Sequence, residues 1–466
     1  MLGLVIGMAP SAAMAGTSDL SAYLQARAAD ADGRVDVAVA AYAQALAADP
    51  ADPVLAIRAY REGIEAGDMA LVDRAARVLN AAGVAPADAA LFPLAEAARK
   101  GNASAASAAV ATLAKGPLVV LAPSLYGWIA HAEGQDPTPA LATAARDPVA
   151  NRFAAETRAL LANAPRKQAL AIGVSRLLGR LAGDLVGGEP SPLSVALAQA
   201  ALLADPGFDR NRVVLAAGLA RNAIVDRALA VLDGVDPKGA FADAAMNQRI
   251  DILLNADREP EALALASARA EAKTAAVADW QRYADLLVTT NDPVAAARWY
   301  GKVVAANDAT WSAWLQYGGA LDQAGRWPEA RVALARAVAQ APTEPLALNY
   351  LGFAQIEHGD DIAASTGMLE RASRLDPQNA SITDSLGWAY HLSGRTPRAL
   401  PLLERAAQAE PTSMEISDHL GDAYWTVGRR YEARYAWRAA SLTAEAKDMT
   451  RIADKIANGL PGAARR

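Results

Sequence analysis

The sequence predicts an all-α fold, an α-solenoid made of antiparallel helix hairpins. The first observation is a repeat, because Gly318, Gly352, Gly387 and Gly421 lie 34, 35 and 34 residues apart. A fixed period of this size is typical of repeat architectures. The second is composition: 53% of residues are hydrophobic and only 6% aromatic, with abundant Ala, the strongest helix former. The third is that no sustained alternation of Val, Ile and Thr predicts strands.

The N-terminal residues 1–15 are predicted to be a signal peptide. Residues 2–9 are mostly apolar, and Ala13-Met14-Ala15 forms a small-x-small cleavage site before Gly16. This predicts a periplasmic or envelope-associated protein. No Lys or Arg precedes the apolar run, so the alternative is an apolar N-terminus on a cytoplasmic protein. No later run is long and apolar enough to predict a transmembrane segment in the mature chain.

Residues 16–208 are predicted to form degenerate Ala-rich helical repeats. One unit, at 19–53, keeps the pattern seen near the C-terminus. The matching positions are Ala38, Tyr42, Ala45 and Pro50 on one side and Ala330, Leu334, Ala337 and Pro342 on the other. From 54 to 208 the pattern fades among Gly and Pro breaks, and whether these residues form true repeats or irregular hairpins stays open.

Residues 209–443 are predicted to form the main array. Ala228, Ala262, Ala296 and Ala330 are each 34 residues apart, which keeps one register through this region. The same small position is expected at Ala364, Ala399 and Ala433, with one extra residue placed at Asp376-Pro377. Residues 444–459 then read as a polar capping helix, which a repeat array needs for solubility. Residues 460–466 read as a disordered tail.

The unit at 380–413 resembles the tetratricopeptide repeat (TPR). The residues that carry the resemblance are Leu386, Gly387, Tyr390, Gly394, Ala399, Leu403, Ala406 and Pro411. The resemblance implies a TPR superhelix in which Gly387 and Ala399 let two helices touch and Gly394 permits the turn between them. The strings at 384–390, 418–425 and 177–208 are also similar to an alphaproteobacterial exported TPR family, which implies an envelope-associated, non-catalytic protein.

Catalytic and cofactor motifs are missing from the sequence. There is no His-Glu-x-x-His, no Gly-x4-Gly-Lys-Ser/Thr and no Gly-x-Ser-x-Gly. Cysteine is absent, which excludes disulfides and thiolate metal sites. The net charge of −6 argues against a nucleic-acid partner. We therefore expect no enzyme activity, no cofactor and no metal. His391 and His419 lie near Asp384 and Asp418, but two half-exposed surface histidines are the preferred interpretation.

The concave groove of the array is the expected binding site. In a TPR, the second, fifth, ninth and twelfth positions of each unit face this groove. The predicted partner-binding residues are Asn349, Phe353, Asp384, Trp388, His391, Asp418, Asp422 and Trp425. This face is acidic and aromatic and carries no Lys or Arg, so it favours a basic or apolar protein segment. The predicted function is a scaffold or adaptor in the bacterial cell envelope.

Two alternatives stay open at this point. One is an accessory protein of polysaccharide synthesis or export that contacts glycan by stacking sugar rings on Trp. The other is structural: Trp388 packs on the neighbouring repeat and Asp384 pairs locally.

Overall fold

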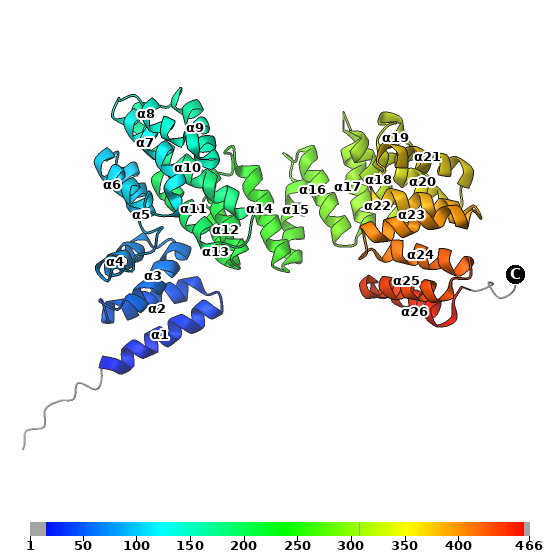
Figure 1. The fold of residues 1–466 in the computed structure, drawn as a ribbon, viewed down its shortest axis with the longest axis horizontal. Helices are drawn as coiled ribbons and strands as arrows, with labels where there is room; N and C mark the ends of the chain where they lie inside the picture. The colour runs from blue at the N-terminus through cyan, green and yellow to red at the C-terminus, as the bar shows by residue number, and fades with distance from the viewer. Residues whose placement is uncertain (1–14, 307, 461–466) are drawn as a thin grey trace, which may run out of the picture. The chain divides into compact units, whose positions relative to one another are not determined.

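The computed structural model describes residues 15–306 and 308–460 (Figure 1). Every regular element in this part of the chain is a helix, and no strand occurs within it. The predicted all-α fold class is therefore confirmed. Apart from Ala15, the predicted signal peptide lies outside the described residues, as do residues 461–466 of the predicted tail.

The chain divides into two compact units, residues 1–262 and 263–466. The helices of the first unit are α1 (Ala15–Ala31), α2 (Val35–Ala48), α3 (Pro53–Ala66), α4 (Met69–Ala81), α5 (Leu91–Arg99), α6 (Ala103–Leu113), α7 (Ala122–Ala132), α8 (Thr138–Ala142), α9 (Pro148–Leu161), α10 (Ala169–Val186), α11 (Pro192–Ala204), α12 (Arg210–Arg221), α13 (Val225–Leu232) and α14 (Ala242–Asn255). Three short 3₁₀ helices, η1 (Pro117–Leu121), η2 (Thr143–Arg146) and η3 (Arg166–Gln168), interrupt the middle of this unit.

The second unit is a regular series of helix pairs. Its helices are α15 (Glu259–Glu271), which begins before the boundary, α16 (Val277–Thr289), α17 (Pro293–Ala305), α18 (Trp311–Gln323), α19 (Trp327–Gln340), α20 (Pro345–Glu357), α21 (Ile362–Leu375), α22 (Ala380–Leu392), α23 (Thr396–Ala409), α24 (Met414–Thr426), α25 (Arg430–Thr443) and α26 (Ala446–Asn458). In each pair from α16 to α25 we call the even-numbered helix A and the following helix B.

Helix starts in both units follow from capping residues. Asp52 accepts hydrogen bonds from the Val54 and Leu55 amides at 2.7 and 3.4 Å, and Pro53 begins α3. Asn379 caps α22 by accepting from the Ile382 amide at 3.2 Å. Such caps satisfy amide groups that have no partner within the helix. Proline suits the first helical position because its missing N–H is not needed there.

The repeat glycines lie where helix A touches helix B of the same unit. A Cβ added at Gly318, Gly352, Gly387 or Gly421 would lie 2.6, 3.1, 2.8 or 2.3 Å from atoms of Leu334, Leu369, Leu403 or Trp437, respectively. These distances are shorter than ordinary carbon contacts, so only glycine fits without a shift of its neighbours. The alanines predicted at the facing position, Ala330, Ala399 and Ala433, are fully buried. The same small-residue role is filled in the first unit by Ala38, beside the buried Tyr42.

One predicted position is wrong. Ala364 is exposed, and Ser365 is the fully buried residue that faces helix A in this unit. Gly359 to Ser365 spans one residue more than Gly325 to Ala330, so the extra residue lies in the turn before α21 and not at Asp376-Pro377. Asp361 in that turn caps α21 by accepting from the Ala363 amide at 2.9 Å.

The turns between paired helices repeat a left-handed backbone conformation. Gly325 and Gly359 have φ of 73° and 74°. The residues 34, 68 and 102 positions before Gly325 are Asn291, Asp257 and Ala223, and their φ values are 60°, 57° and 63°. The backbone therefore keeps the repeat where the sequence has lost its glycine. For Ala this conformation is unfavourable, because the Cβ approaches the following carbonyl.

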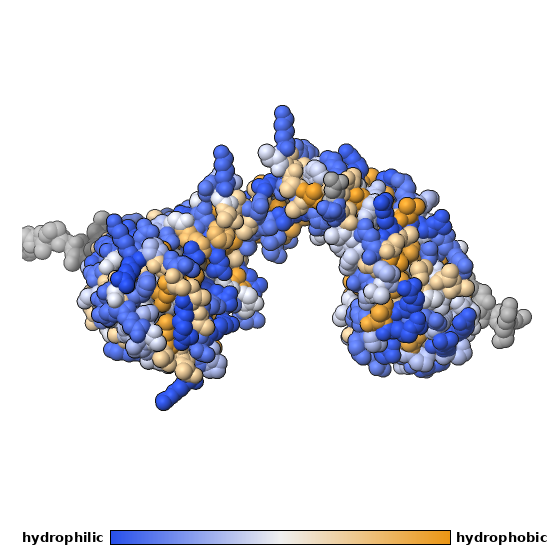
Figure 2. Space-filling view, turned by 90° about the horizontal axis from the view of Figure 1, so that it is seen from above, coloured by the Kyte–Doolittle hydropathy of each residue, from blue (hydrophilic) through white to orange (hydrophobic). Residues whose placement is uncertain are grey.

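Hydrophilic side chains cover most of the visible surface of each unit, with small apolar patches between them (Figure 2). None of the helices in residues 15–306 and 308–460 is long and apolar enough to cross a lipid bilayer.

Candidate functional site

Trp388 of α22 lies at the centre of the predicted face. Its ring stacks on the imidazole of His419 from α24, with centroids 4.0 Å apart and an interplanar angle of 10°. Its Nε1 donates a hydrogen bond to Glu357 Oε1 of α20 at 2.8 Å. One half-buried indole thus connects three successive A helices. Trp388 therefore packs on the neighbouring repeats, as the structural alternative expected, although part of its side chain stays accessible.

Asp384 and His419 form a buried pair beside this indole. Asp384 is 3% exposed and His419 is 8% exposed, and their Oδ2 and Nδ1 atoms are 2.8 Å apart. Burial alone would lower the pKa of His419, but the negative charges of Asp384, Glu415 and Asp418 outweigh burial and raise that pKa above its ordinary value. The expectation of a half-exposed surface histidine is therefore wrong for His419. The second carboxylate oxygen of Asp384, Oδ1, has no hydrogen-bond partner among the described residues.

His391, Phe353 and Asn349 are half-buried side chains of the predicted face. His391 stacks on Trp388 with centroids 5.1 Å apart, and its Nδ1 lies 3.1 Å from Thr396 Oγ1. Burial lowers the pKa of His391, and the nearby His419 lowers it further. The Phe353 ring lies 6.1 Å from that of His419. Asn349 Oδ1 is buried and has no hydrogen-bond partner in the described part of the chain.

The predicted residues of the last repeat have a different role. Asp418 accepts from Lys455 Nζ at 2.7 Å and is also bonded to Arg451, both from α26. Asp422 accepts from Lys455 at 2.9 Å and from Trp437 Nε1 at 2.9 Å. The expectation of a face without Lys or Arg is therefore wrong here. The capping helix supplies the basic groups, so these two carboxylates hold the cap rather than face a partner.

Trp425 also packs under the cap. It is 8% exposed, and its ring lies 5.3 Å from that of Trp437. A Cβ added to Gly459, directly after α26, would lie 1.8 Å from the Trp425 ring. Arg430 lies over the same ring at 3.9 Å. Trp425 is thus a core residue of the last repeat, and its prediction as a partner contact is corrected.

The remaining residues define the Trp388 site. Its members come from α20, α22 and α24: Asn349, Phe353, Glu357, Asp384, Trp388, His391 and His419. The sequence did not identify Glu357 or His419 as members. His419 follows Asp384 by 35 residues, and that spacing is a signal for contact between equivalent turns of neighbouring A helices. Within the described residues, no group of three His, Asp or Glu side chains is arranged to hold a metal ion.

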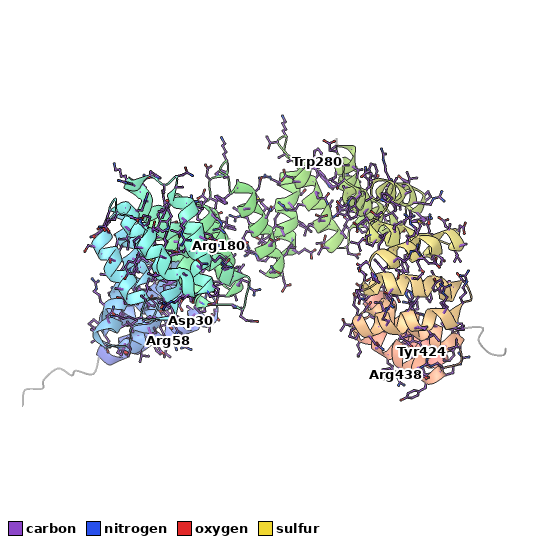
Figure 3. All side chains as sticks on the ribbon, turned by 45° about the horizontal axis from the view of Figure 1, so that its top comes forward. Asp30, Arg58, Arg180, Trp280, Tyr424 and Arg438 are labelled. Carbon is purple, nitrogen blue, oxygen red and sulfur yellow. The ribbon has the colours of Figure 1, made fainter. Side chains whose placement is uncertain are left out.

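Similar polar contacts connect earlier A helices. Gln281 of α16 donates to Gln316 of α18 at 2.6 Å, again 35 residues later. His358, directly after α20, lies 2.6 Å from Asp322 of α18. Figure 3 labels Trp280 on α16 and Tyr424 on α24, which are the first and the last A helix. Polar pairs across neighbouring A helices are therefore a general feature of this unit, and His358 also stacks on Trp327, with centroids 4.3 Å apart. The Trp388 site differs by the unpaired oxygens of Asn349 and Asp384.

Comparisons with known proteins agree with this repeat architecture. The family model described as tetratricopeptide repeat matches residues 311–354, which contain α18 and α19 and most of α20. No curated protein matches the sequence.

Several solved structures of repeat proteins are similar in part. A thermophilic TPR protein from Thermus thermophilus is 21% identical, with 39% of this chain and 100% of that chain covered and a TM-score of 0.36. MamA is 26% identical, with 34% and 93% covered and a TM-score of 0.29. YrrB, a TPR protein with an unusual peptide-binding site, is 18% identical, with 38% and 96% covered and a TM-score of 0.32.

Proposed function

We propose that this chain, in which residues 311–354 match the tetratricopeptide repeat model, is a non-catalytic scaffold that binds a protein partner through the Trp388 site. The single observation that carries this proposal is the state of Trp388 itself. Its indole is only half-buried and lies beside Glu357, which has no basic partner among the described residues, and beside Asp384, whose Oδ1 has no hydrogen-bond partner there although Oδ2 is bonded to His419. Half-buried aromatic side chains surrounded by polar groups are typical hot spots of protein interfaces.

The proposed partner segment is basic and apolar. Asp384 has an unpaired oxygen, and Glu357 and Glu415 are exposed carboxylates around the same aromatic stack. The last repeat supplies an internal precedent, because Asp418, at the position equivalent to Asp384, receives Lys455 and Arg451. A Lys or Arg from a partner would make the same kind of charge-assisted bond. Its apolar neighbours would contact Trp388 and Phe353.

A direct glycan contact has less support. A sugar ring stacks on an open aromatic face, and one face of Trp388 is covered by His419 at 4.0 Å. A sugar ring could stack on that face only if the buried Asp384–His419 pair moved.

The proposed location is the bacterial periplasm or envelope. The support is the apolar run at residues 2–9 and the Ala13-Met14-Ala15 site of the sequence. Intact-mass measurement of protein from the native host tests this. A mature chain beginning near Gly16 agrees with the proposal, and retention of Met1 rejects it.

Crosslinking from an exposed position on the same helix tests the partner proposal. A photoreactive residue at Ser381, on the first turn of α22, should capture a partner whose crosslinked peptide contains Lys or Arg. The matched control is the same residue at Arg438, on α25, which does not belong to the Trp388 site (Figure 3). Equal capture from both positions, or capture of acidic peptides from Ser381, rejects the proposal.

A further inference from the structure

A cavity of about 350 Å³ lies in the first unit, where α3, the α4–α5 connection, η1 and the start of α11 meet. Most of its wall is apolar. The apolar side chains that line it are Ile57, Ile64, Leu118, Leu193 and Val195. Its volume is within the range of small-molecule sites in proteins. This space lies within residues 54–208, the part of the chain where the repeat pattern of the sequence fades.

Three charged side chains also line this cavity, Glu65, Asp88 and Arg61. Neither carboxylate belongs to an ion pair within the described part of the chain. The positive charge of Arg61 lowers the pKa of both without forming an ion pair with either. When both carboxylates are ionised, they and the one guanidinium leave one net negative charge. A partly buried charge without a counter-ion is unfavourable, so the cavity is complementary to a single positive charge.

Tyr60 gives an independent sign of a missing partner. It lines the cavity, is 2% exposed, and its hydroxyl has no hydrogen-bond partner among the described residues. Buried hydroxyls in proteins nearly always have one. Burial and the charge of Asp88 raise the pKa of Tyr60, so this hydroxyl lies in the field of one of the cavity carboxylates.

The pKa values of both cavity carboxylates are raised, as expected for buried carboxylates without a paired cation. Burial, and then the charge of Asp30, raise the pKa of Glu65 to about 7, against the opposing charge of Arg61. Burial also raises the pKa of Asp88, against the effects of its own backbone and of Arg61. Asp30, Arg58 and Glu62 form a neighbouring set of charged groups, because Asp30 and Arg58 act on Glu62 and lie 4.0 Å apart (Figure 3).

We propose that this cavity binds a primary ammonium group on an unbranched apolar stem, with the ammonium between Glu65 and Asp88 and the stem against the apolar wall. The ammonium would bring the net charge of the cavity to zero and place a polar group near Tyr60. A free alkylamine and a lysine side chain of another protein share this chemistry. The site is separate from the Trp388 site and does not depend on the proposed scaffold function.

Isothermal titration calorimetry with n-butylamine at pH 8 tests the proposal on the full chain. We expect saturable binding to one site, and weaker or absent binding of n-butanol, which has a similar stem and no charge. Glu65→Gln and Asp88→Asn should each weaken butylamine binding by about tenfold, the cost of losing one charge-assisted hydrogen bond. Asp73→Asn, an exposed carboxylate on α4, is the matched control and should leave binding unchanged. Equal binding of butanol, or no effect of Glu65→Gln, overturns the proposal.

Two further arms complete the test. Binding should weaken from pH 8 to pH 6 as Glu65 becomes protonated, because an alkylammonium with a pKa near that of Lys, about 10.4, stays charged throughout. Arg61→Gln, at an exposed position, should tighten butylamine binding because it makes the cavity more negative. This variant tests the charge of the cavity even if the carboxylate variants fail to fold.

Tighter binding of N-acetyl-lysine methylamide than of butylamine would assign the ligand to a protein side chain, and the reverse to a free amine. Trp388→Ala should change none of these results.

Discussion

The indole of Trp388 and the imidazole of His419 lie parallel, 4.0 Å apart, on neighbouring A helices. This contact joins a half-exposed aromatic ring to a buried ionisable pair, because His419 is also bonded to Asp384 at 2.8 Å. The surface that we propose for partner binding therefore depends on the packing between two repeats. A change in the charge of His419 should affect both stability and binding.

The first prediction concerns pH. The pKa of His419 is raised in the folded protein by Asp384, Glu415 and Asp418 against the opposing effect of burial. A raised pKa means that the stabilisation is fully present below the unfolded value of about 6.5 and is lost as the pH rises through the folded value. His419→Gln should therefore lower the melting temperature more at pH 6 than at pH 9. A difference that is constant with pH would show that His419 is not protonated in the folded state.

The second prediction concerns the contact between helices A and B. Gly387→Ala should destabilise the protein by about 1–3 kcal/mol, because its Cβ would lie 2.8 Å from Leu403. Gly367→Ala in α21 is the control, because its Cβ would meet no atom within 4 Å. That change should stabilise by up to about 1 kcal/mol through helix propensity. Chemical denaturation measures both, and a shift of the same sign in the two variants would contradict the packing.

The third prediction concerns the left-handed turn at Ala223, where φ is 63°. Ala223→Gly should stabilise the protein by about 1 kcal/mol, since glycine adopts this conformation without the Cβ penalty. Asn291→Gly, at the equivalent position, should have a smaller effect because Asn tolerates positive φ. Thermal melts that show Ala223→Gly to be destabilising would mean that this turn is not left-handed.

The fourth prediction concerns the capping helix. Lys455→Met removes the shared partner of Asp418 and Asp422, both of which are buried. Leaving such carboxylates without their cation costs about 3–5 kcal/mol, although Arg451 should offset part of this. Lys447→Met is the control, because its pair with Glu445 is exposed and contributes at most about 1 kcal/mol. Hydrogen exchange should show α24 to α26 opening first, and equal melting of both variants would contradict this role.

The repeat positions could be predicted from sequence because small residues recur where helices touch. Gly387 and Ala399 were identified this way, and both are buried at that contact. The extra residue of this unit was placed too late in the chain, because Ala364 keeps the 34-residue spacing although Ser365 is the buried residue. The left-handed turn at Ala223 gave no sequence signal, since Ala does not favour that conformation.

The candidate site was harder to predict. Helical offsets placed Trp388 and Asp384 on one face, but they do not show what the next element supplies to that face. Asp418 and Asp422 were assigned to a partner because their basic groups, Arg451 and Lys455, come from a helix outside the repeat pattern. The cavity beside Tyr60 had no signal at all, because four segments distant in sequence form it.

The measurement that tests the central claim most directly is a peptide display selection against the full chain and its variants. The selected peptides should be enriched in Lys or Arg next to apolar residues, and Trp388→Ala should remove that enrichment while keeping the wild-type circular dichroism spectrum. Tyr435→Ala, which removes an exposed aromatic ring from α25, should select the same peptides as the wild type. Enrichment of acidic peptides, or an unchanged selection by folded Trp388→Ala, would contradict the account.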